Sequence, residues 1–441
     1  MDNADKIRKI FARQLLSIKP SDNEIAKVKQ LVLEFGALLN LELKKPRIKA
    51  EVFVGGSLAK NTIIKKKEKY DIDFFVRFDY SKYSGKSSEL SEILAKPVER
   101  LAKKLKIRIE KIHGSRDYFN LSYKAIFLEI IPILKIKKAS EAKNITDISP
   151  LHVSYVVNKL AKRRKLADEI RLAKTFCYVQ GCYGAESYIK GFSGYSLEAL
   201  CIYFGSFLNF LKGAAQWSLA KKIIIDSAKH YKNKNCILTL LNESKLQSPL
   251  ILIDPVQKER NVTAAISSET FENFLKSVNE FLKKPSDEFF KIKIDVSEDL
   301  RKKAKARKAQ FNAFAIESSS DKLDIAGAKS LRISKFILNL MKKYGFAVLD
   351  SKFVFDVVMK KGFFYVVCKN PSARTELSGP PVGLEKYVAE FKKKYKKTSV
   401  KNGKIIAIVK TKVRNAKELL KELAGYKREL KEMQIKRVYL Y

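Results

Sequence analysis

The chain has 441 residues, of which 46% are hydrophobic and 31% are charged. At roughly 100–200 residues per domain, this length predicts two to four domains. The hydrophobic content excludes an intrinsically disordered chain, and the low counts of glycine (18) and proline (11) exclude a collagen-like or low-complexity protein. Lysine and arginine number 89 against 47 aspartate and glutamate residues, which gives a formal net charge of +42.

This charge indicates a polyanionic partner, and nucleic acid is the first candidate because neutralised phosphates supply most non-specific affinity. A generally lysine-rich composition is the alternative, but the acidic residues have not risen to match. No stretch reaches the ~18 uninterrupted apolar residues of a membrane helix, and the charged N-terminus lacks the apolar core of a signal peptide. We therefore expect a soluble, cytoplasmic protein with no membrane partner.

The cysteines and histidines give little support for a soft-metal site. The five cysteines are scattered without a C-x-x-C pair, and there are three histidines. This pattern disfavours a disulfide framework, a zinc site and a histidine-based metal site. Any bound metal is therefore expected to have oxygen ligands.

The first predicted element is a helix over residues 20–40, because Ser21 and Glu24 match the capping box and apolar residues follow at helical spacing. EVFVGGS (51–57) is typical of a strand that runs into a glycine turn. IDFFVRF (72–78) is typical of a second strand. A lysine-rich segment, KKKEK, separates the two strands.

Helical spacing returns over residues 88–106, and AIFLEIIPILKIK (125–137) is an apolar run typical of a buried strand. Residues 1–150 are therefore expected to form a small α/β domain, which we call the head. Residues 151–285 are expected to form a mainly helical neck. Within the neck, amphipathic runs cover 168–181 and 195–212, and PLILIDP is a short buried extended piece.

Helices and strands are mixed again over residues 286–441, which we expect to form an α+β body and a basic tail. The segments with strand composition are 352–359, 362–370 and 403–411, and the basic helices are 384–397 and 416–433. The serine-rich stretch AIESSSDKLD (315–324) is expected to be an exposed link. The fold class predicted for the whole chain is α+β multidomain, with a mixed sheet and helices in the head.

The strongest chemical signal is Gly55-Gly56-Ser57 followed by Asp71 and Asp73. Residues i and i+2 of a strand point to the same face, so the two carboxylates project side by side. Such hard oxygen ligands suit Mg²⁺, while a glycine turn lets the backbone and a serine hydroxyl approach a triphosphate. A surface strand that happens to carry two acids is the alternative, because D-x-D alone is a weak signal.

A third carboxylate strengthens the metal interpretation. Glu129 interrupts the apolar run of residues 125–134, where a buried unpaired carboxylate would be costly. It could reach solvent, pair with a lysine, or come from a neighbouring strand to complete a three-carboxylate site for two-metal phosphoryl transfer.

With these residues the sequence resembles the polymerase-β-like nucleotidyltransferase superfamily. The more specific resemblance is to the archaeal-type, class I CCA-adding tRNA nucleotidyltransferases, and it covers residues 20–270 in order. Four sequence blocks carry it: PLHVSYV (150–156), IRLAKTFCYVQGCYGAE (170–186), GFSGYSLEAL (191–200) and IDPVQKERNVTAAIS (253–267). The segment between the first two blocks is slightly longer than in the family. Residues 271–441 resemble the family's body and tail only loosely, through basic helices and SGPPVG (378–383).

The resemblance implies that Asp71, Asp73 and Glu129 are the catalytic, metal-binding carboxylates. It implies two Mg²⁺ ions, for which Mn²⁺ can substitute. Glu129 stands where the family usually has aspartate, so this carboxylate reaches one methylene further.

The resemblance also implies a set of nucleotide-binding residues: Gly56, Ser57, Lys60, His152, Lys174, Tyr183 and Arg260. Lys60 stands where the family usually has arginine, so a single ammonium charge replaces the bidentate contact that a guanidinium makes with phosphate. Arg260 falls on the arginine that helps to read the incoming base. Without the resemblance, His152 could be a helix-capping or core histidine, and Tyr183 could belong to the packed core. Lys174 and Arg260 are then equally explained as solvated charges or general RNA contacts.

The function that the resemblance implies is template-independent addition of C, C and A to the 3′ end of tRNA from CTP and ATP, with possible repair of damaged ends. The basic body and tail would bind the acceptor and T stem by shape and backbone contacts. The resemblance also implies a homodimer formed through the tail. The alternatives are a poly(A) polymerase or oligoadenylate synthase of the same superfamily, a non-catalytic RNA-binding protein and a ribosomal or chromatin-like basic protein.

Overall fold

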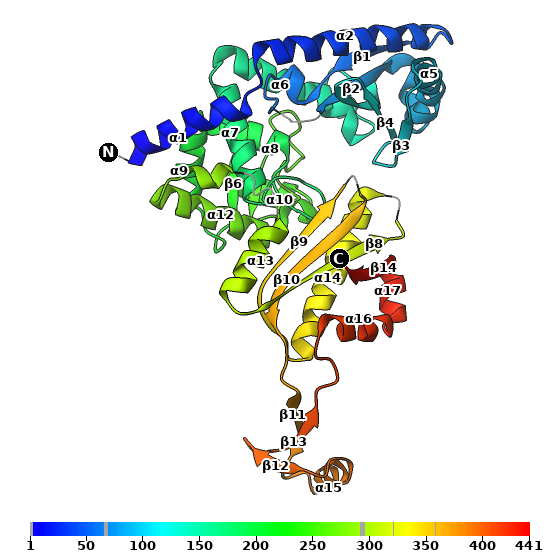
Figure 1. Cartoon of the computed structure of the whole chain (residues 1–441). Helices are drawn as coiled ribbons and strands as arrows, with labels where there is room; N and C mark the ends of the chain where they lie inside the picture. The colour runs from blue at the N-terminus through cyan, green and yellow to red at the C-terminus, as the bar shows by residue number, and fades with distance from the viewer. Residues whose placement is uncertain (1–2, 66–68, 292–295, 321, 358) are drawn as a thin grey trace. The chain divides into compact units, whose positions relative to one another are not determined.

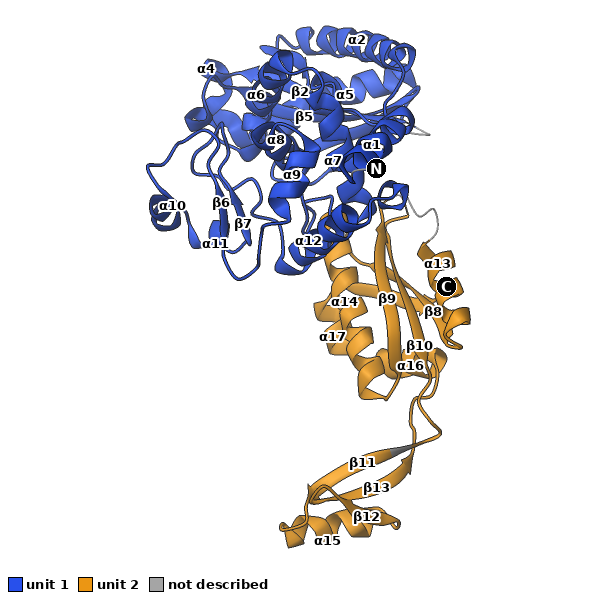
Figure 2. Cartoon of the chain, turned by 90° about the vertical axis from the view of Figure 1, so that its left-hand side faces the viewer, with its two compact units in different colours: residues 1–292 blue, residues 293–441 orange. Residues whose placement is uncertain are grey.

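The computed structural model describes residues 3–65, 69–291, 296–320, 322–357 and 359–441. The chain forms two compact units, residues 1–292 and residues 293–441, which Figure 2 draws in different colours. The predicted KKKEK segment lies partly outside the described residues. The predicted division of the first unit into head and neck at residue 150, like the boundary at 285, stays a prediction.

In the first unit, strands and helices are interspersed up to β5, and the elements after β5 are mainly helical (Figure 1). Its strands are β1 (Ala50–Val54), β2 (Tyr70–Asp79), β3 (Ile109–Ile112), β4 (Tyr118–Tyr123), β5 (Ile126–Lys135), β6 (Ile223–Ile225) and β7 (Leu250–Leu252). Its α-helices are α1 (Asn3–Ile18), α2 (Asp22–Lys44), α3 (Gly56–Ala59), α4 (Tyr80–Tyr83), α5 (Leu90–Leu105), α6 (Ser149–Lys162), α7 (Leu166–Val179), α8 (Gly194–Phe204), α9 (Phe207–Ala214), α10 (Lys234–Leu240), α11 (Glu243–Leu246) and α12 (Ser268–Lys283). Short 3₁₀ helices are η1 (Ser84–Glu89), η2 (Ala139–Glu141), η3 (Ile145–Ile148) and η4 (Asp287–Phe290).

The head is built on a mixed sheet with the strand order β1-β2-β5-β4-β3. Only the β2–β5 pair of this sheet is parallel, and the other pairs are antiparallel. Ile72, Phe74 and Val76 of β2 join a buried cluster with residues of α2 and α5. Because strand side chains alternate between faces, Asp71 and Asp73 are presented on the opposite face.

The neck surrounds a second buried cluster rich in phenylalanine, to which α7, α8, α9 and α12 contribute. Helix α1 packs into this cluster through Ile7, Ile10 and Phe11, although its sequence precedes the head. The predicted amphipathic run 195–212 forms two helices, because Gly205 adopts a left-handed φ of 78° and ends α8.

The second unit contains two sheets, with the orders β14-β8-β10-β9 and β11-β13-β12. Its strands are β8 (Gln310–Ser318), β9 (Ala347–Asp356), β10 (Lys361–Lys369), β11 (Arg374–Pro381), β12 (Thr398–Lys401), β13 (Lys404–Lys410) and β14 (Ile435–Leu440). Its helices are α13 (Val296–Ala306), α14 (Leu323–Lys343), α15 (Glu385–Lys394), α16 (Ala416–Ala424) and α17 (Lys427–Glu432). Helix α14 contributes Ile333 and Ile337 to the core of the four-stranded sheet.

The α+β class and the mixed head sheet are confirmed, as is the capping box of Ser21 and Glu24 at the start of α2. The exposed link over 315–324 is wrong in its first part, because Ala315 and Ile316 are fully buried in β8. A strand paired on both sides buries such residues, and the serines that follow concealed it. Within the described residues, no helix is long and apolar enough to cross a bilayer.

Candidate active site

The three predicted carboxylates lie on neighbouring strands of the head sheet. Asp73 of β2 is the register partner of Glu129 of β5, and Asp71 precedes Asp73 by two residues on the same strand. Adjacent strands lie about 4.8 Å apart, so the backbone brings the bases of these side chains close together. Glu129 is half-buried, and its charge adds to the burial that raises the pKa of Tyr118 to about 12.

The glycine turn between β1 and α3 lies directly against Asp73. Gly56 has a φ of +62°, and a Cβ atom on it would lie 1.8 Å from Asp73 Oδ2. The turn is fixed from the other side by a 2.8 Å hydrogen bond from Gly55 N–H to the carbonyl of Asp73. Only glycine can therefore occupy position 56 without displacing the carboxylate, and Ser57 follows immediately at the start of α3.

The carboxylates fit a divalent cation by donor type and by strand register. Burial raises the pKa of Asp73, and the negative charges of Asp71 and Glu198 add to this, so a nearby cation would favour the ionised form. Among the residues that the structure describes, no three His, Cys, Asp or Glu side chains are grouped closely enough to hold a metal ion.

Two of the predicted nucleotide-binding lysines converge on one buried carboxylate. Lys60 Nζ lies 2.7 Å from Glu198 Oε2, and Lys174 Nζ lies 2.8 Å from Glu198 Oε1. Lys174 also donates to the Thr62 hydroxyl, which donates in turn to Glu198. Glu198 is fully buried, and the two lysines hold its pKa low against the opposing effect of burial. We call Lys60, Thr62, Lys174 and Glu198 the lysine cluster.

A second cluster forms around Asp254, which directly follows the apolar segment of β7. Its carboxylate accepts hydrogen bonds from His152 Nε2 at 2.8 Å and from the Tyr195 hydroxyl at 3.0 Å. Arg260 Nη1 lies 3.6 Å from the same carboxylate, and the His152 and Tyr195 rings stack at 4.0 Å. Burial lowers the pKa of His152 and favours its neutral form. We call His152, Tyr195, Asp254 and Arg260 the histidine cluster.

The carboxylates and the two clusters lie within electrostatic range of one another. The positive charge of Lys60 acts to lower the pKa of both Asp73 and His152. It favours the ionised carboxylate of Asp73 and the neutral ring of His152. Tyr183 adjoins the lysine cluster, because a Cβ atom on Gly194 would lie 3.1 Å from its hydroxyl and 3.7 Å from Lys174 Cε. Burial is the main reason that the pKa of Tyr183 is raised.

The structure therefore brings the predicted residues into one region of the first unit, although their roles there stay predictions. Sequence reasoning missed Thr62, Tyr195, Glu198 and Asp254. Two of them carried a readable signal, because Glu198 interrupts an apolar helical run and Asp254 follows the apolar run of residues 250–253. The same argument had identified Glu129. Tyr195 and Thr62 had no comparable signal.

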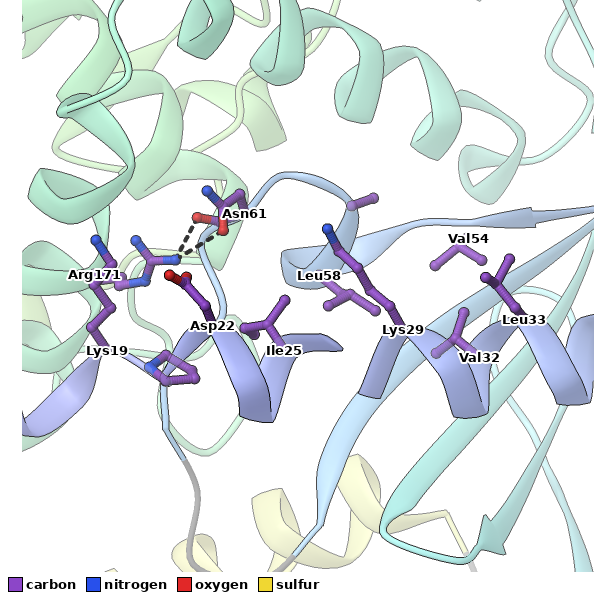
Figure 3. Close-up of a pocket in the computed structure, with 12 residues that line it drawn as sticks. Lys19, Asp22, Ile25, Lys29, Val32, Leu33, Val54, Leu58, Asn61 and Arg171 are labelled. Atoms are coloured by element: carbon purple, nitrogen blue, oxygen red, sulfur yellow. Dashed lines mark hydrogen bonds between the residues drawn. The ribbon is translucent and has the colours of Figure 1, made fainter. Parts of the chain in front are cut away.

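A cavity of about 560 Å³ lies behind the glycine turn (Figure 3). Val54, Leu58 and Asn61 line one side, and Arg171 of α7 lies at the end of the cavity nearest Asn61. None of the predicted carboxylates or nucleotide-binding residues lines this cavity. It is therefore a separate feature from the candidate site, at the back of the turn.

Comparison with known proteins gives a consistent result. Residues 168–291 match the family model described as tRNA nucleotidyltransferase, second domain. The CCA-adding enzyme of Nanoarchaeum equitans is 35% identical over 357 residues, which cover 79% of this chain and 82% of that enzyme. The CCA-adding enzyme of Methanocaldococcus jannaschii is 31% identical over 423 residues, covering 95% of this chain and 91% of the relative.

Among solved structures, the Cid1 poly(U) polymerase bound to MgATP is similar with a TM-score of 0.51 and 14% sequence identity. The match covers 66% of this chain and 99% of that one, and it shows a shared fold. The sequence identity to the two archaeal enzymes extends over most of their length. It therefore shows family membership as well as a shared fold. This chain belongs to the family of CCA-adding enzymes, which are tRNA nucleotidyltransferases.

Proposed function

We propose that this protein adds C, C and A to the 3′ end of tRNA from CTP and ATP, releasing pyrophosphate, without a nucleic-acid template. The observation that carries the proposal is the family membership, at 31% identity over 95% of the chain. The arrangement of carboxylates, glycine turn and lysines in the first unit supports it, because phosphoryl transfer depends on positioning and charge stabilisation.

Asp71, Asp73 and Glu129 would hold the divalent metal that the family uses, with Mg²⁺ as the ion that such oxygen donors suit. When bound, the metal ions favour the ionised 3′-hydroxyl and neutralise the leaving pyrophosphate. The chain supplies the position of the carboxylates through the register of β2 and β5. No side-chain nucleophile is needed.

Residues of both the head and the neck would bind the nucleotide. Lys60 and Lys174 supply positive charge beside the glycine turn, where Gly56 and Ser57 would approach the triphosphate. Arg260, with five donors in a fixed fork, would donate to acceptors on the edge of the base. Its partner Asp254 fixes the position of the guanidinium, and 31% of the Arg260 side chain remains exposed to solvent.

Exposed lysines would bind the tRNA backbone.

We further propose a homodimer formed through the tail. The sheet β11-β13-β12 leaves Val400 at 65% and Ile408 at 58% exposure, and these two apolar side chains would be available to such an interface. Light scattering of the purified protein tests the dimer, and a monomeric mass at micromolar concentration would contradict it.

The enzymatic proposal is tested with a tRNA that ends at the discriminator base. CTP, ATP, UTP and GTP are offered singly and in pairs, and the products are resolved on a gel. We expect two additions with CTP alone and one further addition when ATP is also present. A long A tail, or equal use of an unstructured RNA, would instead indicate a poly(A) polymerase.

A further inference from the structure

The fully buried Glu198 has no role in the chemistry described so far. It lies in α8, while its partners come from elsewhere: Lys60 and Thr62 from the loop after α3, and Lys174 from α7. Lys60 and Glu198 are 138 positions apart in the sequence. One carboxylate therefore joins the loop behind the glycine turn to two helices of the neck.

The loop itself is held on both sides. On one side, Lys60 and Thr62 donate hydrogen bonds to Glu198. On the other side, Arg171 donates to the backbone carbonyls of Asn61 at 2.7 Å and Ile63 at 2.9 Å. Figure 3 shows Arg171 and Asn61 joined by hydrogen bonds on the cavity side. Successive residues of the loop thus alternate between the two sides, and the path that carries Lys60 is fixed.

The charge balance explains why the two ammonium groups can lie close together. Without a carboxylate between them, the side chains of Lys60 and Lys174, 11% and 7% exposed, would repel each other in a region of low dielectric. Members of the cluster act electrostatically on Asp73, Tyr183, His152 and Cys201. None of these has a hydrogen bond to either lysine among those described, so Glu198 is the described acceptor that positions both.

We propose that Glu198 is a positioning residue for triphosphate binding. It holds Lys60 and Lys174 as a pair that contacts the β- and γ-phosphates of the nucleotide. This rests on the proposed function for the identity of the ligand. The carboxylate acts through the lysines and does not touch the nucleotide. Removal of Glu198 should therefore affect the recognition of the phosphates and leave the recognition of the base unchanged.

The test compares equilibrium binding of CTP, CMP and UTP to full-length wild-type and Glu198→Gln proteins, with Mg²⁺ and without tRNA. We expect Glu198→Gln to weaken CTP binding about tenfold, while CMP binding changes less than about twofold, as for a coupled charged pair. The ratio of CTP to UTP affinity should stay at the wild-type value. A merely structural defect would weaken CTP and CMP binding together.

Glu169→Gln is the matched control, because Glu169 is a partly buried neck carboxylate whose described hydrogen bond is accepted from Phe207 N–H. It should leave all three affinities unchanged. Thr62→Val is the second variant in case Glu198→Gln does not fold. It removes the hydroxyl between Lys174 and Glu198 and should weaken CTP binding by a smaller factor, again without affecting CMP.

A double-mutant comparison tests whether Glu198 acts through the lysines. In a Lys60→Ala/Lys174→Ala background, Glu198→Gln should not weaken CTP binding further. Unchanged or tighter CTP binding by Glu198→Gln, or losses that simply add, would overturn the proposal. If wild-type protein binds CTP but adds nothing to tRNA, the proposed function fails and this comparison still decides the role of Glu198. If it binds no nucleoside triphosphate, both proposals fail.

Discussion

The carboxylates of the head sheet are built in the opposite way to the lysine and histidine clusters. Asp71, Asp73 and Glu129 depend on local strand alternation and on one register between neighbouring strands. In the neck, Glu198 and Asp254 are fully buried and collect partners from distant parts of the sequence. His152 and Asp254, for example, are 102 positions apart.

The carboxylates of the two regions therefore have different roles. The head places three acidic side chains on two neighbouring strands, an arrangement that suits an incoming cation. The neck pairs each buried carboxylate with cations or neutral donors of its own, which an isolated buried charge requires. The first region is arranged to receive charge, and the second is arranged to hold side chains in place.

The largest effect should come from the head. Asp73→Ala should reduce nucleotide addition by about 1,000-fold or more, because it removes a carboxylate at the point of charge neutralisation. Single-turnover addition to labelled tRNA measures this, and tRNA affinity should stay close to wild type. Asp79→Asn is the matched control, since Asp79 lies on the same strand and caps α4 through hydrogen bonds that asparagine can also accept. Near-normal addition by Asp73→Ala would refute the metal assignment.

Salt dependence separates the two lysines that are paired with Glu198 from the exposed lysines elsewhere. About six phosphate contacts at about 0.7 each give a log–log slope near −4, so tRNA affinity should fall about 250-fold between about 50 and 200 mM salt. Filter binding measures the slope. Lys60→Ala and Lys174→Ala should leave it unchanged, because Glu198 already neutralises these lysines in part. A nearly flat titration would remove the link between the +42 charge and RNA binding.

A smaller effect is expected at the histidine cluster. Arg260→Ala should reduce the use of CTP and ATP together by about tenfold, the loss typical of one charged hydrogen bond, and should weaken discrimination against UTP. Steady-state addition with each nucleotide measures this. Lys258→Ala, in the same turn, is the control because its described ion pair is a 4.0 Å contact with the adjacent Glu259. Unchanged base choice in Arg260→Ala would exclude Arg260 from base reading.

The smallest effect concerns stability. Burial lowers the pKa of His152 in the folded protein, against the opposing influence of Asp254, so the unfolded chain takes up a proton that the folded chain does not. The free energy of unfolding should therefore fall as pH decreases below about 6.5, by about 1.4 kcal/mol for each unit of pKa difference. His152→Asn should flatten this part of the curve in urea titrations at several pH values.

His230→Asn is the control for that experiment, because His230 is exposed. Asp254 and Glu198, whose pKa values are lowered, affect stability in a different pH range. Their contributions to the free energy of unfolding are lost only as pH falls below about 4. A curve for His152→Asn that still falls between about pH 6.5 and 5 as steeply as the wild type would show that His152 is not the group responsible.

The predictions from sequence were strongest where the controlling interactions are local. The capping box at Ser21 and the alternation of β2 each depend on residues within a few positions. The interpretation of residues 315–318 failed because the burial of Ala315 and Ile316 depends on pairing with β10 and β14. The serines that follow gave a misleading local signal.

By itself the sequence determined the composition, the charge, the periodicity of the main elements and the presence of three carboxylates after a glycine turn. Only the tertiary structure decided which side chains pair with Glu198 and Asp254, and that α1 packs with the neck. The physical reason is that periodicity fixes the face on which a side chain lies, whereas a buried charge must find its partner wherever the fold brings one within hydrogen-bonding distance.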